Sequence, residues 1–93
     1  MATDPHGAVV APGDAEGQAV FILDKIAAAI GLLGGTLEDV VRTRIYLSDP
    51  YRWEEVSRVH ARYFGAVRPA NTLIGAELVG DYLVEIEAEA ELD

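Results

Sequence analysis

An alternation of acidic residues near the end of the chain is the first pattern that suggests chemistry. Successive side chains of a strand point to opposite faces. One polar face would therefore gather Arg42, Arg44 and Tyr46 from residues 40–47, and Glu85, Glu87, Glu89 and Glu91 from residues 82–92. Such glutamates can hold a cation, but we expect them to be solvated or to pair with arginines across strands. The face itself has two interpretations: a solvated exterior, or a surface that meets other copies and lines clefts between them.

The composition limits the class of protein. The 93 residues include 7 basic and 16 acidic ones, a formal net charge of −9, which disfavours binding to nucleic acid or anionic membranes. Without cysteine, disulfides and thiolate chemistry are excluded. No stretch has the roughly 20 apolar residues of a membrane helix, and no signal peptide is recognisable. We therefore expect a cytoplasmic protein with one small domain over residues 1–93, and its size favours association with other copies.

Two helices and three strands account for most of the sequence. Residues 1–13 are irregular, with one candidate short strand at 8–10, and the predicted core spans residues 14–92. The predicted elements are a helix over 15–33, a capped turn at 36–39, a strand over 40–47, a helix from about 50 to 64, and strands over 70–78 and 82–92. Asp14 is a suitable helix cap and Gly34 a suitable stop. The short connection at 79–81 predicts a hairpin of the last two strands.

The alternation also predicts the sheet face that both helices cover. This apolar face would comprise Val41, Thr43, Ile45 and Leu47, then Thr72, Ile74, Ala76 and Leu78, and finally Val84, Ile86, Ala88, Ala90 and Leu92. Asn71 and Glu77 then fall on the polar face. In the second helix Trp53 is predicted to be in the core, and His60 is predicted to pack there, with no visible partner for a metal site.

Several stretches resemble the RidA (YjgF) family of small α+β proteins. They are LEDVVRTRIYLSD at 37–49, similar to the end of the family's first helix and its central strand; WEEV, VH and YF within 53–64, similar to its second helix; RPANT at 68–72, similar to a Pro-Ala-Arg strand start; and LVEIEA at 83–88, similar to a Val-Glu-Ile-Glu-Ala signature. With Gln18 in the first helix, the resemblance covers about residues 12–92.

The resemblance implies a fold, an assembly and an activity. The fold is α+β, a chorismate-mutase-like sheet with two helices on one face. Family members form homotrimers whose sheets pack around a central barrel, with small-molecule sites in the clefts between subunits, so the polar face is expected to lie between subunits. Typical members hydrolyse reactive imines and enamines, such as 2-iminobutanoate and 2-iminopropanoate, to keto acids and ammonia. They use no metal or organic cofactor.

The resemblance also implies which residues carry this chemistry. Glu85 matches the family's catalytic glutamate, which can position or activate water for attack on the imine carbon. Asn71 replaces the arginine that grips the substrate carboxylate with two parallel hydrogen bonds, and losing such a partner costs on the order of 2 kcal/mol. Arg44, on the same predicted face, is a candidate substitute. Ser57 matches a site asparagine. We expect Glu85 to be catalytic, and Asn71, Ser57 and Arg44 to bind substrate.

Two functions remain open from the sequence. One is an imine or enamine deaminase whose activity is reduced by Asn71. The alternative is a non-catalytic trimer on the same fold that binds small metabolites or regulates. A ribonuclease, suggested by the family's L-PSP endoribonuclease label, is disfavoured by the acidic charge and the lack of a histidine pair. The resemblance also implies that the family's N-terminal hairpin is largely missing, which should leave a sheet edge exposed.

Overall fold

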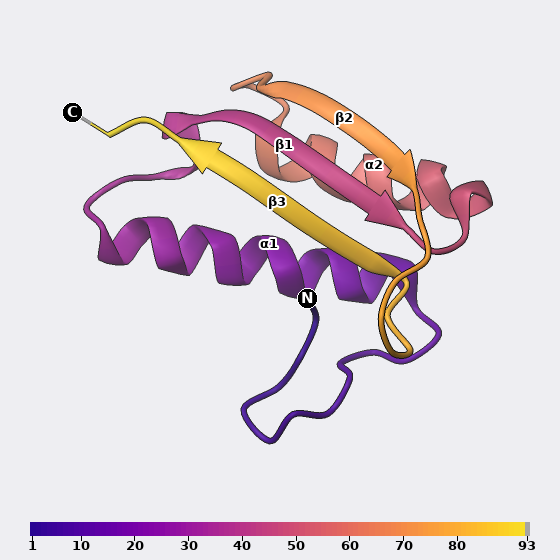
Figure 1. Ribbon diagram of the computed structural model, residues 1–93. Coiled ribbons are helices and arrows are strands. Elements are labelled where there is room, and N and C mark those ends of the chain that lie inside the picture. The colour runs from indigo at the N-terminus through magenta and orange to yellow at the C-terminus, as the bar shows by residue number, and fades with distance from the viewer. Residues whose placement is uncertain (93) are drawn as a thin grey trace.

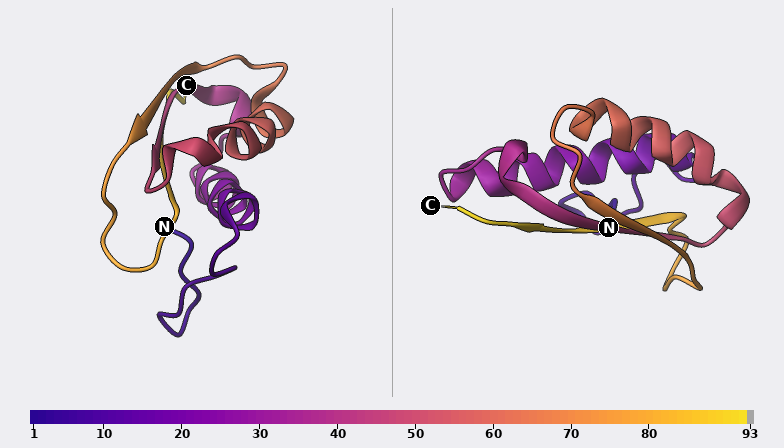
Figure 2. Two further views of the ribbon diagram at one scale, coloured as in Figure 1. Left: turned by 90° about the vertical axis from the view of Figure 1, so that its right-hand side faces the viewer. Right: turned by 90° about the horizontal axis from the view of Figure 1, so that it is seen from above.

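The computed structural model describes residues 1–92, in which two helices cover one face of a three-stranded sheet (Figure 1). β1 (Val40–Leu47) lies in the middle, with β2 (Ala70–Gly75) parallel to it on one side and β3 (Val84–Ala90) antiparallel on the other. α1 (Ala15–Leu32) and α2 (Trp53–Phe64) lie on the same side of the sheet, as the view from above shows (Figure 2). The predicted α+β arrangement is confirmed.

The ends of α1 follow from local sequence. The side chain of Asp14 accepts a hydrogen bond of 2.9 Å from the backbone N–H of Gly17, which satisfies one free donor of the first turn. At the other end Gly34 adopts φ +88°, a conformation that glycine tolerates without strain. The N–H of Gly35 then reaches back 3.0 Å to the carbonyl of Ile30. The predicted cap and stop are confirmed.

Two short 3₁₀ turns connect the main elements. In η1 (Leu37–Asp39) the side chains of Thr36 and Asp39 each accept a backbone N–H of this turn, forming a reciprocal capping box. η2 (Pro50–Arg52) leads directly into α2, and the side chain of Asp49 caps it. The first turn is the capped turn predicted at 36–39, whereas residues 50–52 were predicted to belong to the second helix.

A β-bulge changes which residues of β1 face the helices. Val40 pairs with Ala90 and Arg42 pairs with Glu89, so that Val41 is the extra residue between two successive pairs. Val40 is consequently buried, whereas Val41 is 44% exposed. The prediction that Val41 faces the core is wrong, because the bulge shifts the alternation by one position. The alternation predicted for the rest of the strand holds.

The faces of β2 are the reverse of the predicted ones. Asn71 pairs with Thr43 and Leu73 pairs with Ile45, and both partners on β1 are buried under the helices. Because paired residues of neighbouring strands share a face, Asn71 and Leu73 lie on the helix side, and Ile74 points the other way. The placement of Asn71 on the polar face is therefore wrong. The strand also ends earlier than predicted, at residue 75 instead of 78.

The predicted hairpin of the last two strands is also wrong. β1 lies between β2 and β3, and residues 76–83 pass the end of β1 (Figure 1). The backbone N–H of Ala76 donates to the carbonyl of Leu47 over 2.9 Å, and that of Ser48 donates to the carbonyl of Leu83 over 3.1 Å. Because α2 connects β1 to β2 as a crossover, β2 runs parallel to β1. β1 is the central strand, and its inward side chains are buried.

The core lies between the helices and the sheet. Its buried apolar residues are Ala2, Ala15, Ala19, Ile22, Leu23, Ile30, Val40, Ile45, Leu47, Val56, Val59, Phe64, Val84 and Ile86. Trp53 does not belong to it, since this residue is 49% exposed. Trp53 is the first residue of α2, and this end of the helix extends past the ends of β1 and β2 (Figure 1). Placing Trp53 in the core from its helical spacing was therefore wrong.

A buried amide attaches the N-terminal segment to the sheet. Gln18 is fully buried; its Nε2 donates to the carbonyl of Ala11 over 3.4 Å, and its Oε1 accepts the backbone N–H of Leu83 over 2.9 Å. Before it, a single antiparallel bridge joins Thr3 and Val9 where the sequence suggested a short strand. Gln18 thus connects three segments that are distant in the chain.

Candidate functional site

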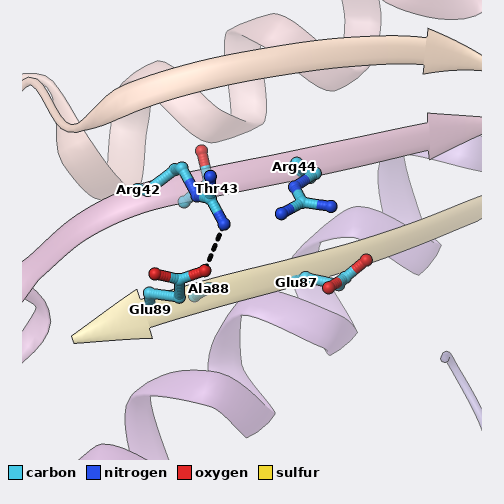
Figure 3. A pocket seen from close by; sticks show the side chains of 6 residues that line it. All are labelled: Arg42, Thr43, Arg44, Glu87, Ala88 and Glu89. Atoms are coloured by element: carbon cyan, nitrogen blue, oxygen red, sulfur yellow. Dashed lines mark hydrogen bonds and ion pairs between the residues drawn. The ribbon is translucent and has the colours of Figure 1, made fainter.

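On the polar face of the sheet, arginines of β1 lie opposite glutamates of β3, as Figure 3 shows. Arg42 and Arg44 of β1 and Glu87 and Glu89 of β3 point out of the face away from the helices. Arg42 forms an ion pair with Glu89, and Arg44 is directly opposite Glu87 in the register. Cross-strand pairing of arginines with glutamates, which the sequence predicted, is therefore present.

Arg44 interacts mainly with its neighbours on this face. Tyr46, and then the carboxylate of Glu87, raise the pKa of the Arg44 guanidinium above its ordinary value, because both favour the charged form. The hydroxyl of Tyr46 also donates to Glu87 over 2.6 Å. Asn71 lies on the opposite face of the sheet, so that the structure does not bring Arg44 and Asn71 together within one chain.

Glu85 belongs to the same polar face. It is opposite Tyr46 in the register, and its side chain is 22% exposed. One carboxylate oxygen accepts the terminal ammonium of Met1 over 2.9 Å and the backbone N–H of Ile86 over 3.2 Å. The structure thus places a half-buried carboxylate among polar side chains, paired with a terminal ammonium.

On the helix side, three polar side chains form a hydrogen-bonded series. The hydroxyl of Thr43, 1% exposed, lies 2.8 Å from Nε2 of His60 on α2 and donates to Oδ1 of Asn71 on β2 over 3.0 Å. The ring of His60 packs on Phe64 with centroids 4.7 Å apart, and burial lowers the pKa of His60. His60 therefore packs as predicted, and it also bonds to the only polar residue buried in β1.

This series borders a cleft of about 280 Å³ between α2 and the start of β2. The cleft is lined by His60, Ala61, Phe64, Gly65, Arg68, Pro69 and Asn71. Arg68 has φ +53°, a left-handed conformation, and its N–H donates to the carbonyl of Phe64 over 2.9 Å. Arg68 and Asn71 thus line the same cleft. Sequence reasoning missed Arg68, although it stands beside the Pro-Ala pair that was read as the strand start.

The four predicted site residues are divided between two surfaces. Glu85 and Arg44 lie on the polar face, Asn71 lies beside the cleft, and Ser57 is a half-buried residue of α2 outside the lining of the cleft. Within residues 1–92, no three histidine or acidic side chains are grouped closely enough to hold a metal ion. None of the helices in this range is long and apolar enough to cross a membrane.

The fold and the two surfaces define a class of small α+β proteins with a chorismate-mutase-like arrangement. A crystal structure of a YjgF/YER057c/UK114 family member from Mycobacterium tuberculosis has a TM-score of 0.83 at 46% identity, covering 85% of this chain and 69% of that one. A protein of unknown function of the Rid protein family from Yersinia pestis has a TM-score of 0.84 at 31% identity, covering 99% and 73%.

Sequence comparison leads to the same family. A RutC family protein of Pyrococcus horikoshii is 34% identical over 88 residues, which are 94% of this chain and 70% of the relative. The family model described as Endoribonuclease L-PSP matches residues 1–92. The chain therefore belongs to the Endoribonuclease L-PSP family, which is the RidA/YjgF family that the motifs indicated.

Proposed function

We propose that this chain is a Rid-type deaminase that hydrolyses small 2-imino acids to keto acids and ammonia. The observation that carries the proposal is the cleft between α2 and β2, where Arg68 and Asn71 are both lining residues. Arg68 supplies the positive charge that Asn71 lacks, and a guanidinium matches the geometry of a carboxylate. The substrate carboxylate binds to this pair.

Glu85 performs the proton transfers in this proposal. Glu85 takes a proton from water as the oxygen attacks the imine carbon and passes it to the imine nitrogen, which gives a carbinolamine. Glu85 then takes the proton of the carbinolamine hydroxyl and delivers it to the nitrogen as the carbon–nitrogen bond breaks, so that the keto acid and ammonia are released. Arg44 lies opposite Glu87 on the same face. Its positive charge offsets the negative charge of Glu87 near Glu85.

An assembly is part of the proposal, because Glu85 and Asn71 lie on opposite faces of the sheet with β1 between their strands. A site that uses both residues takes Asn71 from one copy and Glu85 from the next, as in a homotrimer with clefts between subunits. Light scattering should then give three times the chain mass of 10.0 kDa. The cytoplasm, which suits a chain without cysteine, is the proposed location.

An amino-acid oxidase that releases 2-imino acids in the presence of the purified protein provides the test. The protein should lower the accumulated imine, and Glu85→Gln should abolish this effect. Glu91→Gln is the matched control, since Glu91 is an exposed acid just beyond β3 and should be dispensable. If the protein has no effect with several amino acids, while an arginine-bearing relative is active alongside, the proposed activity is refuted.

Binding without turnover is the second candidate function. It is favoured by the uncharged Asn71 at the position where the family resemblance implies arginine, because an amide alone stabilises a carboxylate less than a guanidinium does. Calorimetry with pyruvate distinguishes the two candidates. Pyruvate binding together with an unchanged imine level would support the binding function over the hydrolase.

A further inference from the structure

The hydrogen bonds around Thr43 determine which end of the Asn71 amide faces the cleft. Thr43 has one hydroxyl proton, and two neighbours compete for it: Nε2 of His60 at 2.8 Å and Oδ1 of Asn71 at 3.0 Å. Because the hydroxyl is buried, it cannot be served by bulk water. If Thr43 donates its hydroxyl proton to Oδ1 of Asn71, its contact with His60 must be a hydrogen bond that the hydroxyl oxygen accepts. Nε2 of His60 must then carry a hydrogen.

We infer that His60 and Thr43 are positioning residues that hold the Asn71 NH₂ group towards the cleft. This inference rests on the proposed role of Asn71 in ligand binding. With Oδ1 held by Thr43, the NH₂ group of the amide is left to donate to an anionic ligand in the cleft that Arg68 also lines. In the other neutral tautomer of His60, Nε2 would accept the Thr43 hydroxyl proton. Thr43 would then accept a hydrogen bond from the NH₂ group of Asn71, and Oδ1 of Asn71 would face the ligand carboxylate.

The fold fixes each member of the series. The parallel register places Asn71 directly opposite Thr43, and packing against Phe64 limits the tilt of the His60 ring. Among residues 1–92, the structure leaves no buried side-chain nitrogen or oxygen unpaired. Hydrogen bonds are therefore donated from His60 to Thr43 and from Thr43 to Asn71. This direction favours ligands that accept hydrogen bonds, such as carboxylates and 2-oxo acids, over ligands with a terminal ammonium.

The first test needs no ligand. Long-range ¹H–¹⁵N correlation spectra distinguish the two neutral tautomers of histidine, and the sequence contains only His6 and His60. At a pH where both are neutral, His60 should show hydrogen on Nε2 in the intact protein, whereas exposed His6 serves as an internal reference. Hydrogen on Nδ1 of His60 would overturn the inference, whatever the protein binds.

The second test separates positioning from packing. Thr43→Val keeps the shape but removes the hydroxyl, and Thr43→Ser keeps the hydroxyl. Pyruvate affinity, measured by calorimetry, should fall about tenfold in the valine variant and stay within about twofold of the original in the serine variant. Equal affinity of both variants would overturn the positioning role. If pyruvate fails to bind the unmodified protein, the proposed role of Asn71 in ligand binding fails, and the tautomer of His60 still decides the inference.

Discussion

Replacing Gln18 by leucine should destabilise the protein much more than the similar size of the two side chains suggests. The side chain is fully buried and accepts the backbone N–H of Leu83 at 2.9 Å, where β3 begins. Leucine fills similar volume but offers no acceptor, so this N–H loses its partner inside the protein. The change therefore disconnects α1 from the start of the strand that carries Glu85.

The magnitude follows from the two hydrogen bonds of Gln18. Leaving the buried N–H of Leu83 unsatisfied costs about 1–3 kcal/mol. The bond to the carbonyl of Ala11 is long, 3.4 Å, and this carbonyl also accepts the backbone N–H of Asp14 over 3.0 Å, so its loss adds little. Burial of an apolar side chain offsets part of the cost, and we expect a net loss of about 2 kcal/mol. For a domain of this size, the Tm should fall by about 8–16 °C.

Urea unfolding at fixed protein concentration measures this loss, because association makes apparent stability depend on concentration. Ala28→Leu is the control, since it introduces the same residue at an exposed position of α1 and should change stability by less than about 0.5 kcal/mol. Amide hydrogen exchange at Leu83 should be faster in the Gln18→Leu variant. If that variant is as stable as the original and Leu83 exchanges no faster, Gln18 does not connect α1 to β3.

Two further predictions concern the backbone and pH. Ala11 has φ +49°, a conformation that favours glycine, so Ala11→Gly should raise the free energy of unfolding by about 1 kcal/mol. The same change at Ala28, within α1, should lower it by about 1 kcal/mol. Changes of the same sign in urea unfolding would contradict this prediction. Burial lowers the pKa of His60, so the unfolded chain binds more protons than the folded one between the lowered pKa and the ordinary one. Stability should fall with decreasing pH in that window, by at most about 1.4 kcal/mol per pH unit. His60→Gln should reduce this slope and His6→Gln should not, as unfolding curves at several pH values will show.

The elements bounded by local chemistry were predictable from the sequence. Asp14 and Gly34 delimit α1 because capping depends on residues within one turn. The capping box at Thr36 and Asp39 is encoded in four consecutive residues. The helix boundaries and the capped turn at 36–39 were accordingly predicted to within a few residues.

The strand faces required information that lies far away in the chain. The bulge at Val41 becomes visible only when β1 is paired with β3. The two faces of β2 contain one large aliphatic residue each, Leu73 and Ile74, so the alternation does not decide between them. The parallel register to β1 decides it, and that register also moves Asn71 to the helix side.

The candidate site was accessible from the sequence only through motifs. These indicated Glu85 and Asn71, and the comparisons confirm the family. They gave no reason to combine Arg68 with Asn71 or Thr43 with His60, because those combinations arise from the packing of α2 beside β2. Thr43, a polar residue at an inward strand position, was the one signal in the sequence that a buried hydrogen-bond partner was required.

Mixing two inactive variants tests most directly whether Asn71 and Glu85 of different copies form one catalytic site. Glu85→Gln and Asn71→Leu variants are unfolded together in equal amounts and refolded, and imine hydrolysis is then measured. In randomly mixed trimers about a quarter of the sites contain an intact Asn71 and an intact Glu85, so about a quarter of the original activity should return. A mixture that stays as inactive as its two components would contradict a site shared between copies.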